Sequence, residues 1–192
     1  MLKDIKVGLA ITGSFCNYPK IQKVIEELKV QHVERIIPII SKVYDTRFYE
    51  KDKFLNMLKE ETGEEIIDTV VKAEPIGPKN MVDIILVVPC TGNTIAKLAN
   101  GITDTPVTMA VKSHIRNNKP VVIGVSTNDG LGVNLKNIGI LLDKKNYYFV
   151  PFRQDDYINK PKSLVLDYSK VINTTKLALK NSQIEPLLVW QI

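Results

Sequence analysis

Four short segments, rich in hydroxyl, amide and glycine residues, are the parts of the sequence best suited to chemistry. Each directly follows a run of apolar residues with the length of a buried strand. Hydroxyl groups can donate hydrogen bonds to phosphate oxygens, and small residues let backbone N–H groups at a following helix start approach an anion. The segments are TGSFCN (12–17), SKVYDTR (41–47), CTGNT (90–94) and STNDG (126–130).

The same residue types also cap helices and form turns, so any one segment alone is explained more simply as a cap. Four such segments after strands of one sheet are harder to explain that way, because parallel strands end at a common edge. TGSF (12–15) is not the G-x-G-x-x-G dinucleotide fingerprint, and the sequence has no G-x-x-x-x-G-K-[ST] loop. A mononucleotide is therefore the favoured ligand.

Apolar runs alternate with helical patterns along the whole chain. The expected strands span residues 5–11, 33–40, 66–71, 82–88, 121–125 and 147–150. The expected helices cover 21–28, 52–62, 94–100, a segment that opens at Pro106, 131–142 and 163–181, with a loop at 73–79. This pattern predicts an α/β fold: a doubly wound, Rossmann-like or flavodoxin-like parallel sheet of about six strands with helices on both faces. We expect a single domain that spans residues 1–192.

Two local expectations follow from the same pattern. Pro89 lacks an N–H group, so we expect it to end the ladder of the preceding strand, and we expect Thr94 to cap or begin the next helix. The buried stripe expected for the helix at 131–142 consists of Leu131, Leu135, Ile138 and Leu142.

The composition is that of an ordinary globular protein, with 44% hydrophobic and 24% charged residues. The longest apolar runs fall short of the ~20 residues that cross a bilayer, so we expect a cytoplasmic protein without a membrane segment. The net charge of +5 is spread along the chain, which favours anionic small molecules over nucleic acid. Two cysteines and two histidines without ligand spacing predict no metal site.

The segments ITGS (11–14) and PCTGNTIAKLANGITD (89–104) resemble the two FMN loops of the flavoprotein family that includes phosphopantothenoylcysteine decarboxylase, peptidyl-cysteine decarboxylases and flavin prenyltransferases. The resemblance implies that FMN is bound at the four polar segments. It also implies a trimer-based homo-oligomer, in which neighbouring chains complete the site. The implied FMN contacts are Thr12, Gly13, Ser14, Phe15, Ser41, Thr91, Gly92, Asn93, Thr94, Ser126, Thr127 and Asn128.

A second group of strings resembles one branch of this family, in which the chain is one component of a two-subunit enzyme of spore-forming bacteria. These strings are AEPIGPK (73–79), TRF (46–48), VSTNDGLGVN (125–134) and YFVPF (148–152). The resemblance implies a partner A subunit and the oxidation of a small dicarboxylate. The alternatives are a free-standing FMN-dependent decarboxylase or prenyltransferase and a non-catalytic structural subunit.

The sequence departs from the family at its catalytic positions. Where the cysteine decarboxylases carry a histidine, this chain has Glu74, which we consider as a general acid or base. Arg153 stands at roughly the place of the prenyltransferase tyrosine. Arg153 and Arg47 could each bind a substrate carboxylate through two N–H groups, and the simpler alternative for both is a surface salt bridge.

Three further features are open to two interpretations. Cys16 and Cys90 each follow a strand and are a redox pair or, more simply, two buried thiols. The aromatic side chains at 44, 48 and 49 form a lid over the ligand or pack within their own loop. The apolar C-terminal segment IEPLLVWQI (184–192) is expected to seek a partner surface.

Overall fold

The computed structural model describes residues 1–13, 17–41 and 50–189. Its strands are β1 (Lys6–Ile11), β2 (Arg35–Ile40), β3 (Ile84–Cys90), β4 (Val121–Thr127), β5 (Tyr147–Phe149), β6 (Phe152–Asp156) and β7 (Lys160–Leu166). Its helices are α1 (Tyr18–Val30), α2 (Lys51–Thr62), α3 (Val70–Ala73), α4 (Gly92–Ala99), α5 (Pro106–Ile115), α6 (Leu135–Asp143) and α7 (Val171–Ala178), with 3₁₀ turns η2 (Glu74–Ile76) and η3 (Tyr168–Lys170).

The strands form one seven-stranded sheet with the order β2-β1-β3-β4-β7-β6, and β5 pairs with β4 outside this path. Strands β1 to β5 are parallel, whereas β6 and β7 form an antiparallel hairpin. The parallel part has the flavodoxin-like order 2-1-3-4-5, so the connections leave β1 and β3 in opposite directions. The helices after these two strands therefore lie on opposite faces, and in sheets of this kind ligands bind at the carboxyl ends of the strands beside this switch point.

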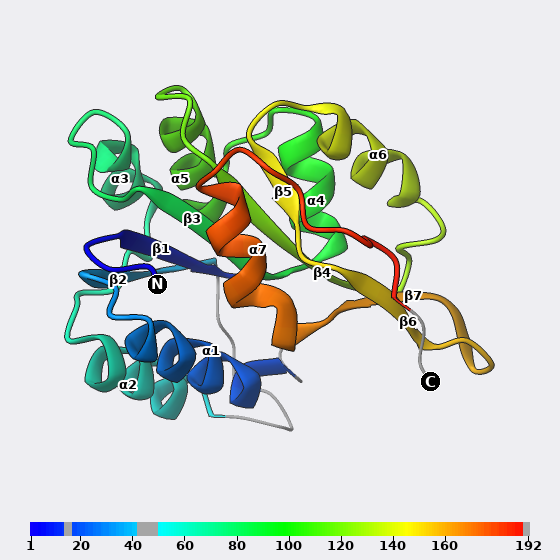
Figure 1. Ribbon diagram of the computed structural model, residues 1–192, viewed down its shortest axis with the longest axis horizontal. Coiled ribbons are helices and arrows are strands. Elements are labelled where there is room, and N and C mark those ends of the chain that lie inside the picture. The colour runs from blue at the N-terminus through cyan, green and yellow to red at the C-terminus, as the bar shows by residue number, and fades with distance from the viewer. Residues whose placement is uncertain (14–16, 42–49, 190–192) are drawn as a thin grey trace.

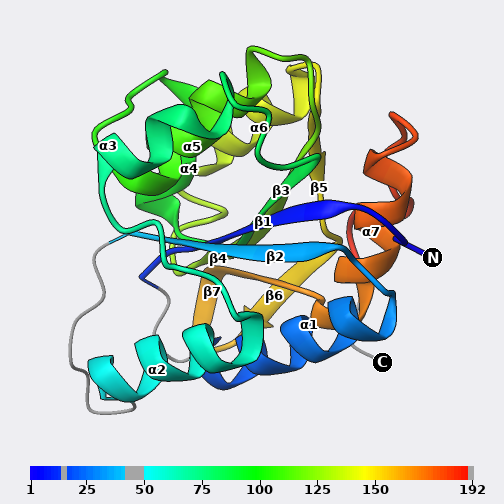
Figure 2. The ribbon, with the colours of Figure 1, turned by 90° about the vertical axis from the view of Figure 1, so that its left-hand side faces the viewer.

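Helices cover both faces of the sheet, as the sequence predicted. Figures 1 and 2 show α1 and α2 on one side and α3, α4, α5 and α6 on the other. Each face has its own hydrophobic core, and residues of α7 belong to the core on the α1 side. The central strand β3 alternates between the cores: Ile84 and Leu86 belong to the α1 side, and Ile85 and Val87 to the α5 side.

The prediction of a strand at 66–71 is wrong. Ile67 forms only an isolated parallel bridge with Ile39, and the chain then enters α3. Thr69 caps this helix, because its hydroxyl accepts a hydrogen bond from the Lys72 N–H at 3.2 Å. The loop expected at 73–79 also contains the end of α3 and the turn η2, so the prolines shape a helical connection rather than an irregular one.

Pro89 does not end the ladder of β3. The strand continues to Cys90, which pairs with Val125 after a register shift that begins at Val87. The Val88–Pro89 peptide bond is cis. The irregularity accommodates the missing N–H, and it turns Cys90 into the core on the α5 side.

The prediction of a long helix at 163–181 is also wrong. Its first part is β7, which pairs with β6 through a turn that the sequence interpretation missed. The Asp156 carboxylate accepts hydrogen bonds from the N–H groups of Ile158 and Asn159 at 3.2 and 3.0 Å, and so closes the hairpin. The helical part is limited to η3 and α7.

The stripe expected for the helix at 131–142 is mostly wrong. Leu131, Leu135 and Leu142 are exposed, and only Ile138 of the expected stripe is buried. Helix α6 starts at Leu135 and buries Asn137, Ile138 and Leu141. The inward face is displaced because Asn137 bonds within a polar network below this helix.

Among the helices of the described residues, none combines the length and the apolar character that a membrane span needs.

Candidate functional site

Thr12 links the carboxyl ends of β1 and β3. Its buried hydroxyl donates to the Pro89 carbonyl at 2.9 Å and accepts from the Thr91 N–H at 2.9 Å. The Thr91 hydroxyl in turn donates to that of Thr94 at 3.2 Å. Three of the hydroxyl residues predicted to bind the ligand thus form one chain of hydrogen bonds across the carboxyl ends of the two strands.

Helix α4 begins at this chain of hydrogen bonds. Its N-cap is Thr91, so the prediction that Thr94 caps or begins the helix is wrong, and the Thr91 side chain forms no capping hydrogen bond to the backbone. The N–H groups of Gly92, Asn93 and Thr94 lie in the first turn, where a helix has no internal acceptors for them. Thr94 is buried and the Asn93 side chain is exposed. Donors of this kind, together with the helix dipole, favour an anion.

Ser126 is joined to the start of α1. The Asn17 amide donates to the Ser126 hydroxyl at 3.0 Å, which connects the carboxyl end of β4 to the helix after β1. Asn128 is directed elsewhere, because its amide oxygen accepts a hydrogen bond at 3.5 Å from Ser163 on β7. Of the candidates in the fourth polar segment, Ser126 therefore lies toward α1 and Asn128 toward the hairpin.

A polar network beneath the start of α4 was missed by the sequence interpretation. The Asp129 carboxylate accepts hydrogen bonds from Thr127 and, at 3.0 Å, from the Asn134 amide. The Asn134 amide oxygen then accepts from Asn137 at 2.9 Å. These hydrogen bonds, first that of Thr127, hold the pKa of Asp129 below its usual range, so the carboxylate is charged at neutral pH.

Gly92 fits against this network only because it lacks a side chain. A Cβ atom at this position would lie 2.5 Å from the Thr127 hydroxyl and 2.8 Å from an Asp129 carboxylate oxygen, and would also overlap the Asn134 amide. The network thus sets the position of the first residue of α4. The signal in the sequence was the pair of asparagines at 134 and 137, whose i, i+3 spacing places both on one helix face.

Ser41 carries a buried hydroxyl group that lacks a hydrogen-bond partner among the residues that the structure describes. Its backbone N–H donates to the Ile11 carbonyl at 3.1 Å, so Ser41 lies beside the end of β1. Gly13, which is partly exposed, follows Thr12 at the same edge. An unsatisfied buried hydroxyl costs free energy, and a ligand oxygen at this edge would relieve that cost.

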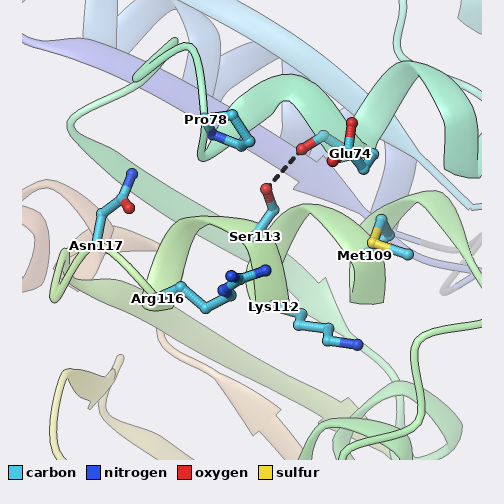
Figure 3. Close-up of a pocket in the computed structure, with 7 residues that line it drawn as sticks. All are labelled: Glu74, Pro78, Met109, Lys112, Ser113, Arg116 and Asn117. Atoms are coloured by element: carbon cyan, nitrogen blue, oxygen red, sulfur yellow. Dashed lines mark hydrogen bonds between the residues drawn. The ribbon is translucent and has the colours of Figure 1, made fainter.

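Glu74 lies apart from the strand ends, on a cavity of about 410 Å³ between η2 and α5. In Figure 3, Glu74 and Pro78 lie on one side of the cavity, and Lys112 and Arg116 lie on the other. The Ser113 hydroxyl donates to the Glu74 carbonyl at 2.6 Å and accepts from the Gly77 N–H at 2.9 Å. The seven lining residues include none of the predicted FMN contacts, so an acid–base role for Glu74 stays a prediction.

Arg153 lies on β6 and lines another cavity, between this strand and α1. The remaining predicted site residues, Ser14, Phe15 and Arg47, lie outside the described residues, as do Cys16 and the aromatic side chains at 44, 48 and 49. At the C-terminus, the Val189 N–H donates to the Phe152 carbonyl at 3.1 Å, and Leu188 is exposed. Residues 187–189 of the apolar segment thus lie along β6, and residues 190–192 lie outside the described residues.

Cys90 is fully buried, and burial raises the pKa of its thiol, so it is a neutral packing residue in this structure. His114 is also buried, which lowers its pKa to about 4, and its ring bonds the Pro120 carbonyl at 3.1 Å. Among the described residues, no group of three or more histidine, cysteine or acidic side chains is arranged to hold a metal ion.

Comparison with known proteins finds relatives that match nearly the whole chain. The chain is 44% identical over 191 residues to the B subunit of dipicolinate synthase from Bacillus subtilis (strain 168), and the match covers 98% of this chain and 95% of that protein. The crystal structure of the corresponding dipicolinate synthase component from Bacillus halodurans C superimposes with a TM-score of 0.91, at 40% identity, over 100% of this chain and 99% of that chain.

More distant relatives share the fold. The FMN-dependent cysteine decarboxylase SpaF matches with a TM-score of 0.69 at 20% identity, over 94% of this chain and 98% of its own. The peptidyl-cysteine decarboxylase EpiD matches with a TM-score of 0.65 at 24% identity, over 88% and 96%. The sequence profile of the Flavoprotein family matches residues 1–166. The strand-end threonines and the start of α4 thus lie within the matched region, and the chain belongs to the flavoprotein family.

Proposed function

We propose that this chain is the B subunit of a dipicolinate synthase and acts with an A subunit to oxidise dihydrodipicolinate to dipicolinate during sporulation. The observation that carries the proposal is the 44% identity to the Bacillus subtilis protein over 98% of the chain. The decarboxylases SpaF and EpiD, at 20% and 24% identity, support the shared fold alone. We place the protein in the cytoplasm, as a homo-oligomer based on a trimer.

We further propose that the cofactor is FMN, bound at the carboxyl ends of β1, β2 and β3. Two features of the chain fit a phosphate there: the buried Ser41 hydroxyl without a partner among the described residues and the uncapped N–H groups at the start of α4. Gly13, Ser41 and Thr94 would hold the phosphate, and Thr12 would keep the two strand ends together. A bound flavin would supply the capacity to accept the substrate's electrons.

Reconstitution tests the functional proposal. The purified chain should be yellow, and acid should release FMN from it. We expect no dipicolinate from dihydrodipicolinate with either component alone and turnover when the two are mixed, since this sequence has no dinucleotide fingerprint of its own. Light scattering on the same sample gives the size of the assembly.

Two results of that experiment would contradict the proposal. Full turnover by this chain alone would remove the need for an A subunit. Full turnover by the A subunit alone would leave this chain only a structural role, in line with the non-catalytic alternative. A decarboxylation or prenyl-transfer activity of the isolated chain would instead favour the other enzyme class.

Ser41→Ala tests the phosphate site. We expect FMN affinity to fall by about 10- to 150-fold, because a hydrogen bond to a charged group is worth about 1.5–3 kcal/mol. The stability of the flavin-free protein should not fall, since the hydroxyl has no partner among the described residues to lose. Fluorescence titration with FMN measures the first effect and thermal unfolding the second. Ser182→Ala, at an exposed position on another part of the surface, is the control, and equal FMN affinity of both variants would refute the assignment.

A further inference from the structure

A second cavity, of about 340 Å³, lies between α1 and the β6–β7 hairpin. This volume is within the range of about 300–1,000 Å³ that is usual for small-molecule sites. The cavity is polar and rich in charge, and most of its lining comes from elements that carry no predicted cofactor contact. The lining residues that matter for the argument are Lys20, Lys23, Glu27, Arg153, Asp155 and Tyr168.

The strand register places Arg153 close to the carboxyl end of β4. Ser126, the last-but-one residue of β4, pairs with Val165 on β7, and Val165 pairs with Arg153 on β6. Side chains of directly paired residues point to the same face of a sheet, and adjacent strands are about 4.8 Å apart. Since Ser126 contacts Asn17 at the start of α1, Arg153 also points to the α1 face, about two strand spacings away.

Arg153 is half-buried, and one donor of its guanidinium lacks a hydrogen-bond partner among the residues that the structure describes. Its Nε–H is buried without a hydrogen-bond acceptor among the described residues. The nearby acids are engaged elsewhere: Asp155 pairs with Lys160 at 3.4 Å, and Asp167 accepts hydrogen bonds from Ser169. A buried donor without an acceptor costs free energy, and an anion bound beside Arg153 would relieve that cost.

A second cation faces the same cavity. The Lys20 ammonium lies 5.0 Å from the centre of the Tyr168 ring, an arrangement that directs this flexible side chain over the cavity. Lys23 also lines the cavity, but Glu27 follows it by four residues on α1 and can neutralise it. Arg153 and Lys20 are therefore the two cations of the lining that are best placed to bind an added anion.

We propose that this cavity is the binding site for the two carboxylates of the substrate, with Arg153 binding one carboxylate through two N–H groups and Lys20 pairing with the other. This inference rests on the proposed function for the identity of the dicarboxylate. It adds a site on the α1 face, built by the hairpin and separate from the phosphate site at α4. A planar guanidinium suits a carboxylate better than an ammonium does, which explains an arginine at the more buried position.

Isothermal titration of the flavin-saturated, full-length protein with pyridine-2,6-dicarboxylate tests the proposal. We expect Arg153→Lys to weaken binding by about tenfold or more, because the charge remains but the two-pronged contact is lost. Lys20→Gln should weaken it by a smaller factor. Arg35→Lys, which alters an arginine paired with Glu64 at the start of β2, and Lys29→Gln on the same helix as Lys20 should leave binding unchanged.

Benzoate, which has one carboxylate, distinguishes the role of Arg153 from that of Lys20. Its binding should be weaker and sensitive to Arg153→Lys, but insensitive to Lys20→Gln. Unchanged pyridine-2,6-dicarboxylate affinity in Arg153→Lys would overturn the assignment of the cavity. Failure of the wild-type protein to bind the dicarboxylate would overturn it as well.

The proposal for this cavity and the proposed function can be refuted separately. FMN affinity and turnover of the mixed subunits report on the function, whereas the titrations report on the cavity. Thermal unfolding of Arg153→Met adds an independent readout: without ligand, its melting temperature should equal or exceed that of the wild type, because an unsatisfied buried donor is removed. A marked drop would show that Arg153 is held by the fold itself and would overturn a role in ligand binding.

Discussion

Gly92→Ala should destabilise the protein by about 2–3 kcal/mol and weaken FMN binding, the larger effect being on the cofactor. The added methyl group would lie 2.5 Å from the Thr127 hydroxyl and would overlap the Asn134 amide. Overpacking of this kind costs about 1–3 kcal/mol. The start of α4 or the Asp129 network must therefore move, and the proposed phosphate donors move with it.

Denaturant unfolding and FMN titration of the purified variant measure the two effects. A melting temperature lower by several degrees is expected, since 1 kcal/mol shifts it by about 2–4 °C in a protein of this size. Gly139→Ala in α6 is the matched control, because a Cβ atom there meets nothing within 4 Å. That variant should be more stable by about 0.5–1 kcal/mol. Wild-type FMN affinity in Gly92→Ala would argue against a ligand at the start of α4.

Gly77→Ala should lower the free energy of unfolding more than Gly92→Ala does, but it should leave FMN affinity unchanged. A Cβ atom at Gly77 would overlap the Ser113 carbonyl and lie 2.6 Å from the Ser113 hydroxyl. The backbone of α5 cannot move aside as a side chain can, so we expect a loss of about 3 kcal/mol. The Asn117 amide, which donates to the Gly77 carbonyl at 2.7 Å, would lose its partner too.

The comparison of Gly77→Ala with Ser113→Ala separates two costs to stability: that of steric overlap and that of lost hydrogen bonds. Ser113→Ala removes the hydroxyl that joins Gly77 to Glu74 but adds no atoms, so its cost should be only about 1–3 kcal/mol. Urea unfolding of both variants, with Gly139→Ala as reference, gives the difference. If Gly77→Ala were as stable as the wild type, the backbone at Gly77 could not lie as close to α5 as the structure places it.

The parallel part of the sheet could be predicted because its strands are continuous apolar runs. The strand expected at 5–11 is β1 (Lys6–Ile11), and that expected at 121–125 is the main part of β4 (Val121–Thr127). Burial on both faces leaves no position for a polar residue, so the sequence signal is strong. The threonines at the ends of β1 and β3 could be found for the same reason, since they follow these runs directly.

The hairpin could not be predicted from periodicity. Leu164 and Leu166 lie in the cores of opposite faces, and the apolar run that contains them fits a strand or a helix equally well. Asp167 separates β7 from α7 by accepting hydrogen bonds from Ser169 at 3.0 and 2.7 Å, but a single aspartate does not interrupt a helical pattern. The strand form of this segment depends also on the pairing of β7 with β4 at Ser126 and Thr127, which are far away in the sequence.

Part of the candidate site was missed for a related reason. Asp129, Asn134 and Asn137 are ordinary turn and helix residues in the sequence, and only the packing of α4 against α6 brings them beneath Gly92. The strand-end hydroxyls were recognised because they are local to strand ends. Their supporting network was not, because its members come from the turn after β4 and from the helix that follows.

The forked pairing of β4 has a consequence for how such proteins can diverge. Its first residues, Val121 to Ile123, pair with β5, whereas only Ser126 and Thr127 pair with β7. The hairpin is thus paired with the rest of the sheet through two residues of β4, and the strands β1 and β3, which end at the proposed phosphate site, do not pair with it. Substitutions in the hairpin can therefore accumulate while the strand-end loops stay the same, so the proposed substrate site can diverge independently of the proposed cofactor site.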